Sequence, residues 1–309
     1  MSASPPLVQS PVSAFAVAAA LAVLYLVWGS TYLGIRFALE GGWPPLLMAG
    51  SRFLVAGGLL FAVLRLRGVP MPTPRQWRNS AFMGALLLGL GNGMVCIAEQ
   101  SVSSGLAAVA VASAPLWIAL FATLRGQRSN CLEWLGLGIG FVGVLWLNAG
   151  SSLAATPVGL VALLVAPAAW AFGSVWSQGR DLPSPFMGAA AQMLCGGAMM
   201  LVAGLLLGER LDTMPSVKGV LAVAYLAGFG SIVAFSAYVW LLHHVRATLA
   251  GSYAYVNPVV AVALGAWLAA ERFSAHDIGA MVVILLGVVA ITLSKVRAPR
   301  RLKAAGAAT

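Results

Sequence analysis

Ionisable side chains are rare inside the long apolar runs of this chain, so the few that occur there are the first candidates for chemistry. Arg52 lies seven residues into the run that begins at Pro45, roughly 10 Å along a helix. A charge at such a depth in an apolar run is costly, and it marks a functional site by default. We interpret Arg52 as a buried cation that pairs with Glu99 or with an anionic group of a ligand. The alternative is a side chain that snorkels to a polar interface.

Glu99 and His243 each stand at the end of an apolar run. Such positions suit a gate, because a donor and an acceptor that meet there can close one mouth of a pathway and part when it opens. We therefore predict gating roles for Arg52, Glu99, Gln192 and His243. For Glu99 the alternative is a solvated helix end.

Polar and aromatic side chains also gather near the middle of several runs. A pocket with aromatic walls and a few fixed polar groups is the usual site for a small ligand. Tryptophans more often mark a membrane interface, and Trp43, Trp77 and Trp134 fit that role, but Trp28 and Trp170 lie deeper in their runs. The predicted binding residues are Trp28, Thr31, Asn92, Ser113, Trp117, Trp170, Ser174, Ser231, Tyr253, Tyr255 and Asn257.

Two prolines, Pro115 and Pro258, lie in the middle of apolar runs. Each removes one backbone donor and frees the carbonyl four residues earlier, that of Val111 or Ala254. A freed carbonyl near the middle of a membrane can bind a polar ligand. The alternative is a helix kink that serves packing alone.

The composition explains why these groups must be positioned by membrane helices. Of 309 residues, 61% are hydrophobic and only 8% are charged, with a mean hydropathy of +0.93, whereas a soluble domain carries about 25% charged residues. About 20 apolar residues span a bilayer as a helix, so the sequence predicts an all-α integral membrane protein with ten spans. The runs are Val12–Phe37, Pro45–Leu64, Trp77–Ala98, Ser104–Leu124, Leu132–Asn148, Pro157–Gln178, Pro183–Leu207, Ser216–Leu242, Thr248–Ala269 and His276–Ser294.

The basic residues set the expected orientation. With the N-terminus inside, thirteen Lys and Arg residues fall on the cytoplasmic side, and three fall outside with Arg36 at an outer helix end. By the positive-inside rule both termini are cytoplasmic, in a multi-pass protein of the cell inner (plasma) membrane. The net charge of +10 is thus an orientation signal, and no nucleic-acid partner is expected.

The chain also repeats itself, in a first five-helix unit at 12–149 and a second at 156–295, followed by a basic cytoplasmic tail at 296–309. The alignment places Trp28 on Trp170, Arg52 on Gln192 and Pro115 on Pro258, and it brings His243 to the Glu99–Gln100 position. Because each unit has five spans, an odd number, the second enters the membrane from the opposite face. Such an inverted repeat places a ligand site near the midplane between the halves.

Several strings of residues resemble a known family. They are Leu26-Val-Trp-Gly-Ser-Thr-Tyr, Ser51-Arg-Phe, Ala112-Ser-Ala-Pro-Leu-Trp and Ala270-Glu-Arg-Phe-Ser. In this order and spacing the chain resembles the drug/metabolite transporter superfamily, in its ten-helix form with two EamA-type repeats. The resemblance implies export of small metabolites, often amino acids. The chain departs from the family where an acidic residue usually follows the fourth helix, because Arg128 stands there.

The sequence therefore predicts a secondary transporter that exports small zwitterionic or neutral solutes, amino acids among them, by alternating access. The alternative is a flippase or a transporter of lipid-linked or phosphorylated sugars, for which Arg52 alone offers a phosphate site. An enzyme is not expected, because the runs contain no cluster of catalytic side chains. The three cysteines show no paired spacing, so we expect no metal and no cofactor. The expected partners are the solute and the lipid bilayer, and the oligomeric state and energy coupling stay open.

Overall fold

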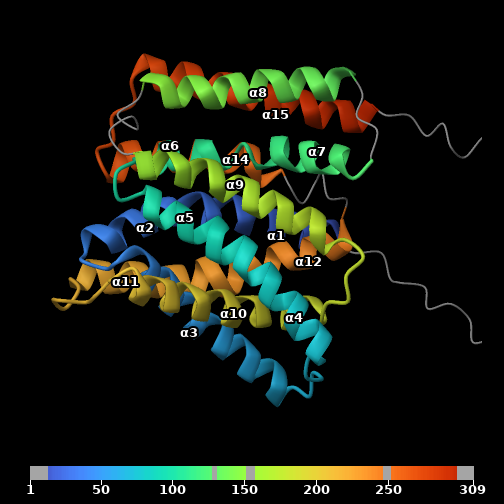
Figure 1. Ribbon diagram of the computed structural model, residues 1–309, viewed down its shortest axis with the longest axis vertical. Helices are drawn as coiled ribbons and strands as arrows, with labels where there is room; N and C mark the ends of the chain where they lie inside the picture. Colours follow the sequence, from blue (N-terminus) through green and yellow to red (C-terminus); the bar gives the residue numbers. More distant parts are fainter. Residues whose placement is uncertain (1–12, 127–130, 151–156, 246–251, 298–309) are drawn as a thin grey trace, which may run out of the picture.

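The computed structural model describes residues 13–126, 131–150, 157–245 and 252–297, and every regular element in that part of the chain is a helix (Figure 1). Three segments, η1, η2 and η4, are π-helical and lie inside longer helices. In chain order the elements are α1 (Ala14–Val23), η1 (Leu24–Trp28), α2 (Gly29–Glu40), α3 (Pro45–Leu66), α4 (Pro74–Met83), η2 (Gly84–Asn92), α5 (Gly93–Ala98), α6 (Ser104–Val111), α7 (Ala114–Leu124), α8 (Cys131–Gly150), α9 (Pro157–Ser177), α10 (Pro185–Leu206), α11 (Val217–Tyr225), η4 (Leu226–Phe235), α12 (Ser236–His244), α14 (Tyr253–Leu268) and α15 (Ala275–Arg297).

Seven helical stretches in the described residues are long and apolar enough to cross a membrane, and three shorter apolar helices accompany them at 134–143, 256–268 and 275–287. These ten segments correspond to the ten predicted runs, so the predicted all-helical membrane fold is confirmed. The seven long stretches are Ala14–Glu40, Pro45–Leu66, Pro74–Ala98, Ser104–Leu124, Pro157–Ser177, Pro185–Leu206 and Val217–Leu241.

The helix starts follow from local chemistry. Pro45 and Pro185 occupy first-turn positions, where the missing N–H costs nothing and the fixed φ suits a helix. At α4, Thr73 and Gln76 form a capping box, in which each side chain bonds the other's backbone N–H. Ser103 accepts from the first turn of α6 in the same way.

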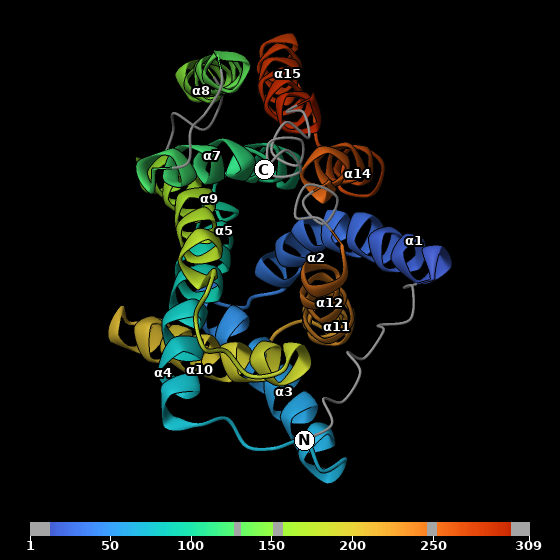
Figure 2. The same cartoon turned by 90° about the vertical axis from the view of Figure 1, so that its right-hand side faces the viewer.

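Helices that the internal repeat aligns pack against each other. The second helices of the two halves, α3 and α10, form one such pair, and the last helices, α8 and α15, form another (Figure 2). Glycine permits the close approach in the second pair, because a Cβ at Gly287 would lie 2.5 Å from the Cα of Gly140. The pairing of α6 with α14 adds a third counterpart contact. The arrangement is that of two inverted five-helix repeats.

The prolines act differently in the two halves. A turn at Ala112 and Ser113, shortly before Pro115, interrupts the helical hydrogen-bond pattern while both residues keep right-handed dihedrals, so α6 and α7 are separate helices. In the counterpart, α14 runs through Pro258 without a break.

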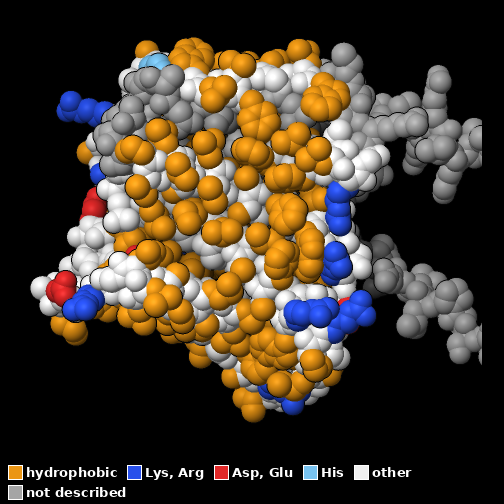
Figure 3. All heavy atoms as spheres, viewed as in Figure 1, with side chains coloured by type: hydrophobic (Ala, Val, Ile, Leu, Met, Phe, Trp, Pro, Cys, Tyr) orange, Lys and Arg blue, Asp and Glu red, His pale blue; other side chains and the backbone are white. Residues whose placement is uncertain are grey.

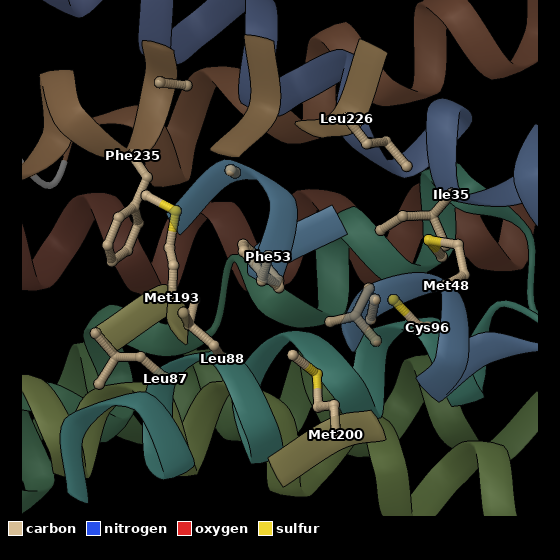
Figure 4. Close-up of a cluster of buried hydrophobic side chains, with 14 of the residues drawn as sticks. Ile35, Met48, Phe53, Leu87, Leu88, Cys96, Met193, Met200, Leu226 and Phe235 are labelled. Carbon is tan, nitrogen blue, oxygen red and sulfur yellow. The ribbon is translucent and has the colours of Figure 1, made fainter. Parts of the chain in front are cut away.

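A band of hydrophobic side chains covers the middle of the surface, and charged side chains lie beyond it at two opposite sides, mostly basic on the right and both acidic and basic on the left (Figure 3). We call one side the arginine-rich end, where α3, α7 and α9 end and α4 begins; it holds Arg65, Arg67, Arg75, Arg78, Arg125 and Arg180. We call the other the acidic end; it holds Glu40, Glu209 and Glu271 together with Arg36, Arg210 and Lys218. The apolar interior lies between them and includes Phe53, Leu88 and Met193 (Figure 4).

Candidate functional site

A cavity lies inside the helix bundle. Both repeats contribute to its wall. The lining residues are Trp28, Thr31, Tyr32, Ile35, Arg52, Phe53, Leu88, Gly91, Asn92, Val95, Val111, Ala114, Ala166, Trp170, Gly230, Phe235, Tyr253 and Asn257.

The three π-helical segments all contribute to this wall. Trp28 ends η1, Asn92 ends η2, and Gly230 lies within η4. A π-helical turn is rare and concentrates at functional sites, because the extra residue per turn re-aims the side chains beyond it. The widened turns therefore bring polar and aromatic groups to the cavity that a regular helix would direct elsewhere.

One side of the cavity is a cluster of aromatic rings centred on Trp28. Its ring lies 5.9 Å from that of Trp170 and 5.0 Å from that of Tyr253, and both contacts are edge-to-face. Tyr238 packs behind them, 5.1 Å from Trp28. The indole N–H of Trp28 donates to the carbonyl of Gly230 at 3.2 Å. The cluster is thus a fixed wall that joins helices of both halves.

Arg52 is the one charged side chain among the described residues that line the cavity. It is 3% exposed, its guanidinium stacks 4.5 Å from the ring centroid of Phe53, and its Nη2 donates to Asn92 Oδ1 at 2.5 Å. Its Nε and Nη1 have no hydrogen-bond partner. A buried donor without a partner carries a substantial desolvation cost, so the cavity presents unused donors beside a positive charge.

Asn257 supplies the matching acceptor. Its side chain is 4% exposed, and its Oδ1 has no hydrogen-bond partner. The cavity therefore combines a cation with free donors, a free amide oxygen and an aromatic wall. Such a set suits a small ligand that carries a carboxylate and a hydrogen-bond donor on an apolar body.

The structure places seven of the predicted site residues on this wall: Trp28, Thr31, Arg52, Asn92, Trp170, Tyr253 and Asn257. Ser113, Ser174 and Ser231 instead donate to backbone carbonyls three to five residues earlier in the chain, at 2.6, 2.8 and 3.0 Å. Trp117 packs against Phe121 and Phe141 outside the lining. The side chains of Tyr255 and His243 lie outside the described residues.

Four aromatic residues at or behind the cavity were not predicted: Tyr32, Phe53, Phe235 and Tyr238. Tyr32 follows Trp28 by four residues, so helical spacing could have placed both on one face. Phe53 adjoins Arg52 in sequence, and stacking of a guanidinium on an aromatic ring is a common arrangement.

At the acidic end, Glu271 links three parts of the chain. Its carboxylate accepts from the backbone N–H and hydroxyl of Ser104 at 2.9 and 2.6 Å and from the N–H of Gly105 at 3.1 Å, and it pairs with Arg36 at 2.5 Å. Glu271 thereby caps α6 and ties it to α2. Burial alone would raise the pKa of Glu271, but the bonds from Ser104 and Arg36 outweigh it and hold the pKa below its usual value.

The predicted Arg52–Glu99 pair is not formed in this structure. Arg52 donates to Asn92 instead, and neither carboxylate oxygen of Glu99 has a hydrogen-bond partner. Glu99 follows the end of α5 and lines a second hollow at the acidic end, which we call the acidic vestibule; its wall includes Arg36, Glu40, Trp43, Glu99, Ser103 and Glu209. Gln192 is buried in α10, whose backbone there lies against Gly84 of η2.

At the arginine-rich end, the contacts of the described residues are separate hydrogen bonds. The side chain of Gln76 donates to the Asp181 carboxylate at 2.9 Å, and that of Asn79 donates to the Asp181 carbonyl at 2.8 Å. Arg125 donates to the carbonyl of Val175 at 2.5 Å. In the described residues no group of three His, Cys, Asp or Glu side chains is placed to hold a metal ion.

Similarity to known proteins agrees with this architecture. A 283-residue stretch is 48% identical to a protein named "Uncharacterized inner membrane transporter YedA" from Escherichia coli (strain K12), over 91% of this chain and 92% of that one. "Uncharacterized transporter YoaV" from Bacillus subtilis (strain 168) is 25% identical over 79% and 85% of the two chains. A solved structure titled "Crystal structure of protein" superposes with a TM-score of 0.66 at 22% identity, over 90% of this chain and 98% of that one.

The sequence pattern of the EamA-like transporter family matches residues 15–149 and again residues 157–293. Together these two segments cover most of the chain, and each contains five of the ten apolar segments. The resemblance inferred from the sequence strings is thus confirmed, and the chain belongs to the EamA-like transporter family.

Proposed function

We propose that this transporter exports small zwitterionic or neutral metabolites, with amino acids as the class that fits best, by alternating access across the inner membrane. The observation that carries the proposal is Arg52, which reaches an otherwise uncharged aromatic cavity with two unpaired nitrogen atoms. A guanidinium with free donors binds a carboxylate by charge-assisted hydrogen bonds. In this account Arg52 is the anchor for the acid group of the solute.

The other groups of the cavity suit the rest of such a solute. The free Oδ1 of Asn257 can accept from an ammonium or amide donor. The rings of Trp28 and Tyr253 offer an apolar wall. A solute with several negative charges would face a single countercharge in a site of low dielectric, where an unpaired charge is costly.

The position of the cavity supports transport by alternating access. Residues of both repeats line it, and inverted repeats rock around a site at their interface. We extend the predicted orientation to this fold: both termini are cytoplasmic, the arginine-rich end faces the cytoplasm and the acidic end faces outward. A reporter fused after Thr309 is expected to be active only in its cytoplasmic form.

A phosphorylated or lipid-linked sugar is the second candidate, because a guanidinium also binds phosphate. Phosphate sites are commonly built from several cations or helix N-termini. Here one arginine and an aromatic wall are present among the described lining residues. Transport of such sugars is therefore the competing outcome in the test.

The test uses purified protein in liposomes, with counterflow of radiolabelled amino acids, organophosphates and a fluorescent lipid-flipping probe in parallel. We expect counterflow of amino acids. In Arg52→Gln the counterflow rate should fall about 30-fold or more, because the substitution removes one partner of the buried charge pair between Arg52 and the solute carboxylate. Arg78→Gln, which removes the same charge from an exposed site, should transport like the wild type. Movement of organophosphates or lipids alone would overturn the proposal.

A further inference from the structure

Glu99 differs from the other carboxylates of the acidic vestibule. Glu40 pairs with Arg36 and Lys218, and Glu209 accepts from two backbone N–H groups at the start of α3. Glu99 is 6% exposed, and neither of its oxygens has a hydrogen-bond partner. A buried, unpartnered carboxylate is expensive when it is ionised and far less so when it is protonated. Glu99 therefore has no structural task that would require its charge.

The position of Glu99 connects the two hollows of the protein. It lines the acidic vestibule, and its charge acts on Tyr32 and Arg52, both of which line the central cavity. A carboxyl group at this place lies between the solute site and the acidic end.

Charged and titratable groups face Glu99 from each neighbouring element. Arg36 and Tyr32 belong to α2, Arg52 to α3 and Cys96 to α5, and Glu271 lies in the loop before α15. Glu40, Glu209 and Arg210 line the same vestibule. Burial is the largest influence and raises the pKa of Glu99, which follows the span that ends at Ala98; Glu271 raises it further, and Arg52 and Arg36 oppose.

We propose that Glu99 is a proton-binding site that couples solute transport to the proton gradient. In the closed state the carboxyl group holds a proton taken from water. When the vestibule opens, hydration stabilises the carboxylate and the proton passes to the outer solution. This inference goes beyond the proposed function and requires only that the chain is a transporter.

The charges also set the direction of coupling. An ionised Glu99 is stabilised by the nearby Arg52. A solute carboxylate bound to Arg52 neutralises that cation and so favours the protonated form of Glu99. Binding of one thus promotes binding of the other, by reciprocal linkage. Solute and proton therefore leave together, driven by the outward solute gradient, because the inward proton gradient across the inner membrane opposes their exit.

The first test needs no solute. Infrared difference spectra of reconstituted protein, recorded between neutral and alkaline buffer, are expected to show the carbonyl band of a protonated carboxyl group. The band should vanish in Glu99→Gln and persist in Glu40→Gln, which changes an exposed carboxylate at the same end. A spectrum in which Glu99→Gln keeps the full band, or a wild-type spectrum without it, overturns the proposal.

The second test uses the amino-acid flux of the transport assay, with the membrane potential clamped at zero. For one proton per solute, a gradient of one pH unit should shift the equilibrium solute ratio about tenfold, with accumulation away from the acidic side. Glu99→Gln should retain solute exchange but lose this shift, and Glu40→Gln should keep it. A shift retained in Glu99→Gln, a shift of opposite sign, or wild-type flux that ignores the gradient contradicts the inference.

Two measures keep the outcomes separable. Glu99→Asp retains a carboxyl group and should keep the pH-driven shift of the solute ratio. This variant decides the question even if Glu99→Gln loses flux because it misfolds. If Glu99→Asp exchanges solute without showing the shift, Glu99 is not the proton site. If no amino acid is transported at all, the proposed function fails, while the infrared test still decides whether Glu99 carries the proton.

Discussion

The two ends of the molecule are held together by different kinds of contact. At the acidic end, one buried carboxylate, Glu271, joins α6, α2 and its own loop through an ion pair and three hydrogen bonds. At the arginine-rich end, Asp181 accepts single hydrogen bonds from Gln76 and Asn79, and Gln76 is partly exposed. The bond from Gln76 to the Asp181 carboxylate and the bond from Arg125 to the Val175 carbonyl are charge-assisted as well, but among the described residues each is a separate contact, whereas Glu271 gathers four contacts on one buried carboxylate. The acidic end is therefore the harder one to open.

The difference suggests how the transport cycle is biased. A switch rests in the state whose contacts are stronger, and a ligand shifts it only by binding the other state better. If the acidic end is outward, as we propose, the resting transporter is closed to the outside and receives solute from the cytoplasm. Substitutions that remove single contacts at each end test this asymmetry, and their expected effects decrease from Glu271 to Asp181.

Removal of the Glu271 carboxylate should have the largest effect. The side chain is 1% exposed and its partner Arg36 is 28% exposed, so Glu271→Ala leaves a partly buried cation and an uncapped helix. We expect the free energy of unfolding to fall by about 3 kcal/mol, measured by denaturation in detergent. The control Glu40→Gln changes an exposed pair and should cost no more than about 0.5 kcal/mol. Equal losses in the two variants would show that the buried pair is not special.

Acid should weaken the same end without a mutation, by less than the substitution does. Because the folded-state pKa of Glu271 lies below its usual value, its contribution is present above the unfolded value of about 4.3 and is lost as the pH falls through the folded value. The stability difference between wild type and Glu271→Ala should be constant near neutral pH and shrink in strong acid. A difference that grows as the pH falls would have the wrong sign.

Glu209 should matter less than Glu271. Its carboxylate accepts from the backbone N–H groups of Leu46 and Leu47 at about 3 Å and so caps α3. Loss of a helix cap costs about 1 kcal/mol, and Glu209→Ala should lower the unfolding midpoint accordingly. Glu209→Gln keeps a hydrogen-bond acceptor, so it should be more stable than Glu209→Ala. If the two variants are equally unstable, the effect comes from the charge alone.

The smallest effect is expected at the arginine-rich end. Asp181→Ala removes the acceptor of the Gln76 bond and leaves the capping box of α4 intact, and an exposed hydrogen bond contributes about 0.5–1 kcal/mol. We expect a slight loss of stability and easier opening at that end, measured by the rate of thiol labelling from the arginine-rich side. A loss as large as that of Glu271→Ala would remove the asymmetry between the ends.

The sequence predicted the spans well and the site only in part. Helix starts such as Pro45 and Ser104 are local signals, and hydropathy identifies a span without knowledge of its neighbours. The face of each helix that meets the cavity is not local. The π-helical turns that end at Trp28 and Asn92 rotate the next helical turns about the helix axis, so regular helical spacing fails there.

The sequence predicted more polar site residues than the cavity wall contains, for a physical reason. The hydroxyl of a serine in an apolar helix can donate to a carbonyl of the preceding helical turn, as those of Ser174 and Ser231 do. Arg52 was expected to meet Glu99, but Asn92, seven residues before Glu99, lies nearer to the depth of Arg52 in its helix. The bridge between Arg36 and Glu271 joins residues 235 positions apart, and only the fold brings them together.

In the proposed transport cycle, the cavity binds the solute and opens alternately to the two ends. The most direct test is Ala166→Cys, a cavity position, in a background without the native cysteines, labelled by an impermeant thiol reagent from one side at a time. We predict that the introduced thiol is labelled slowly from the acidic side and that a saturating amino acid slows this labelling further. In Glu271→Ala the labelling rate should rise more than tenfold, because a change of about 1.4 kcal/mol already gives a factor of ten. Labelling that is unchanged by Glu271→Ala and by solute would contradict the account.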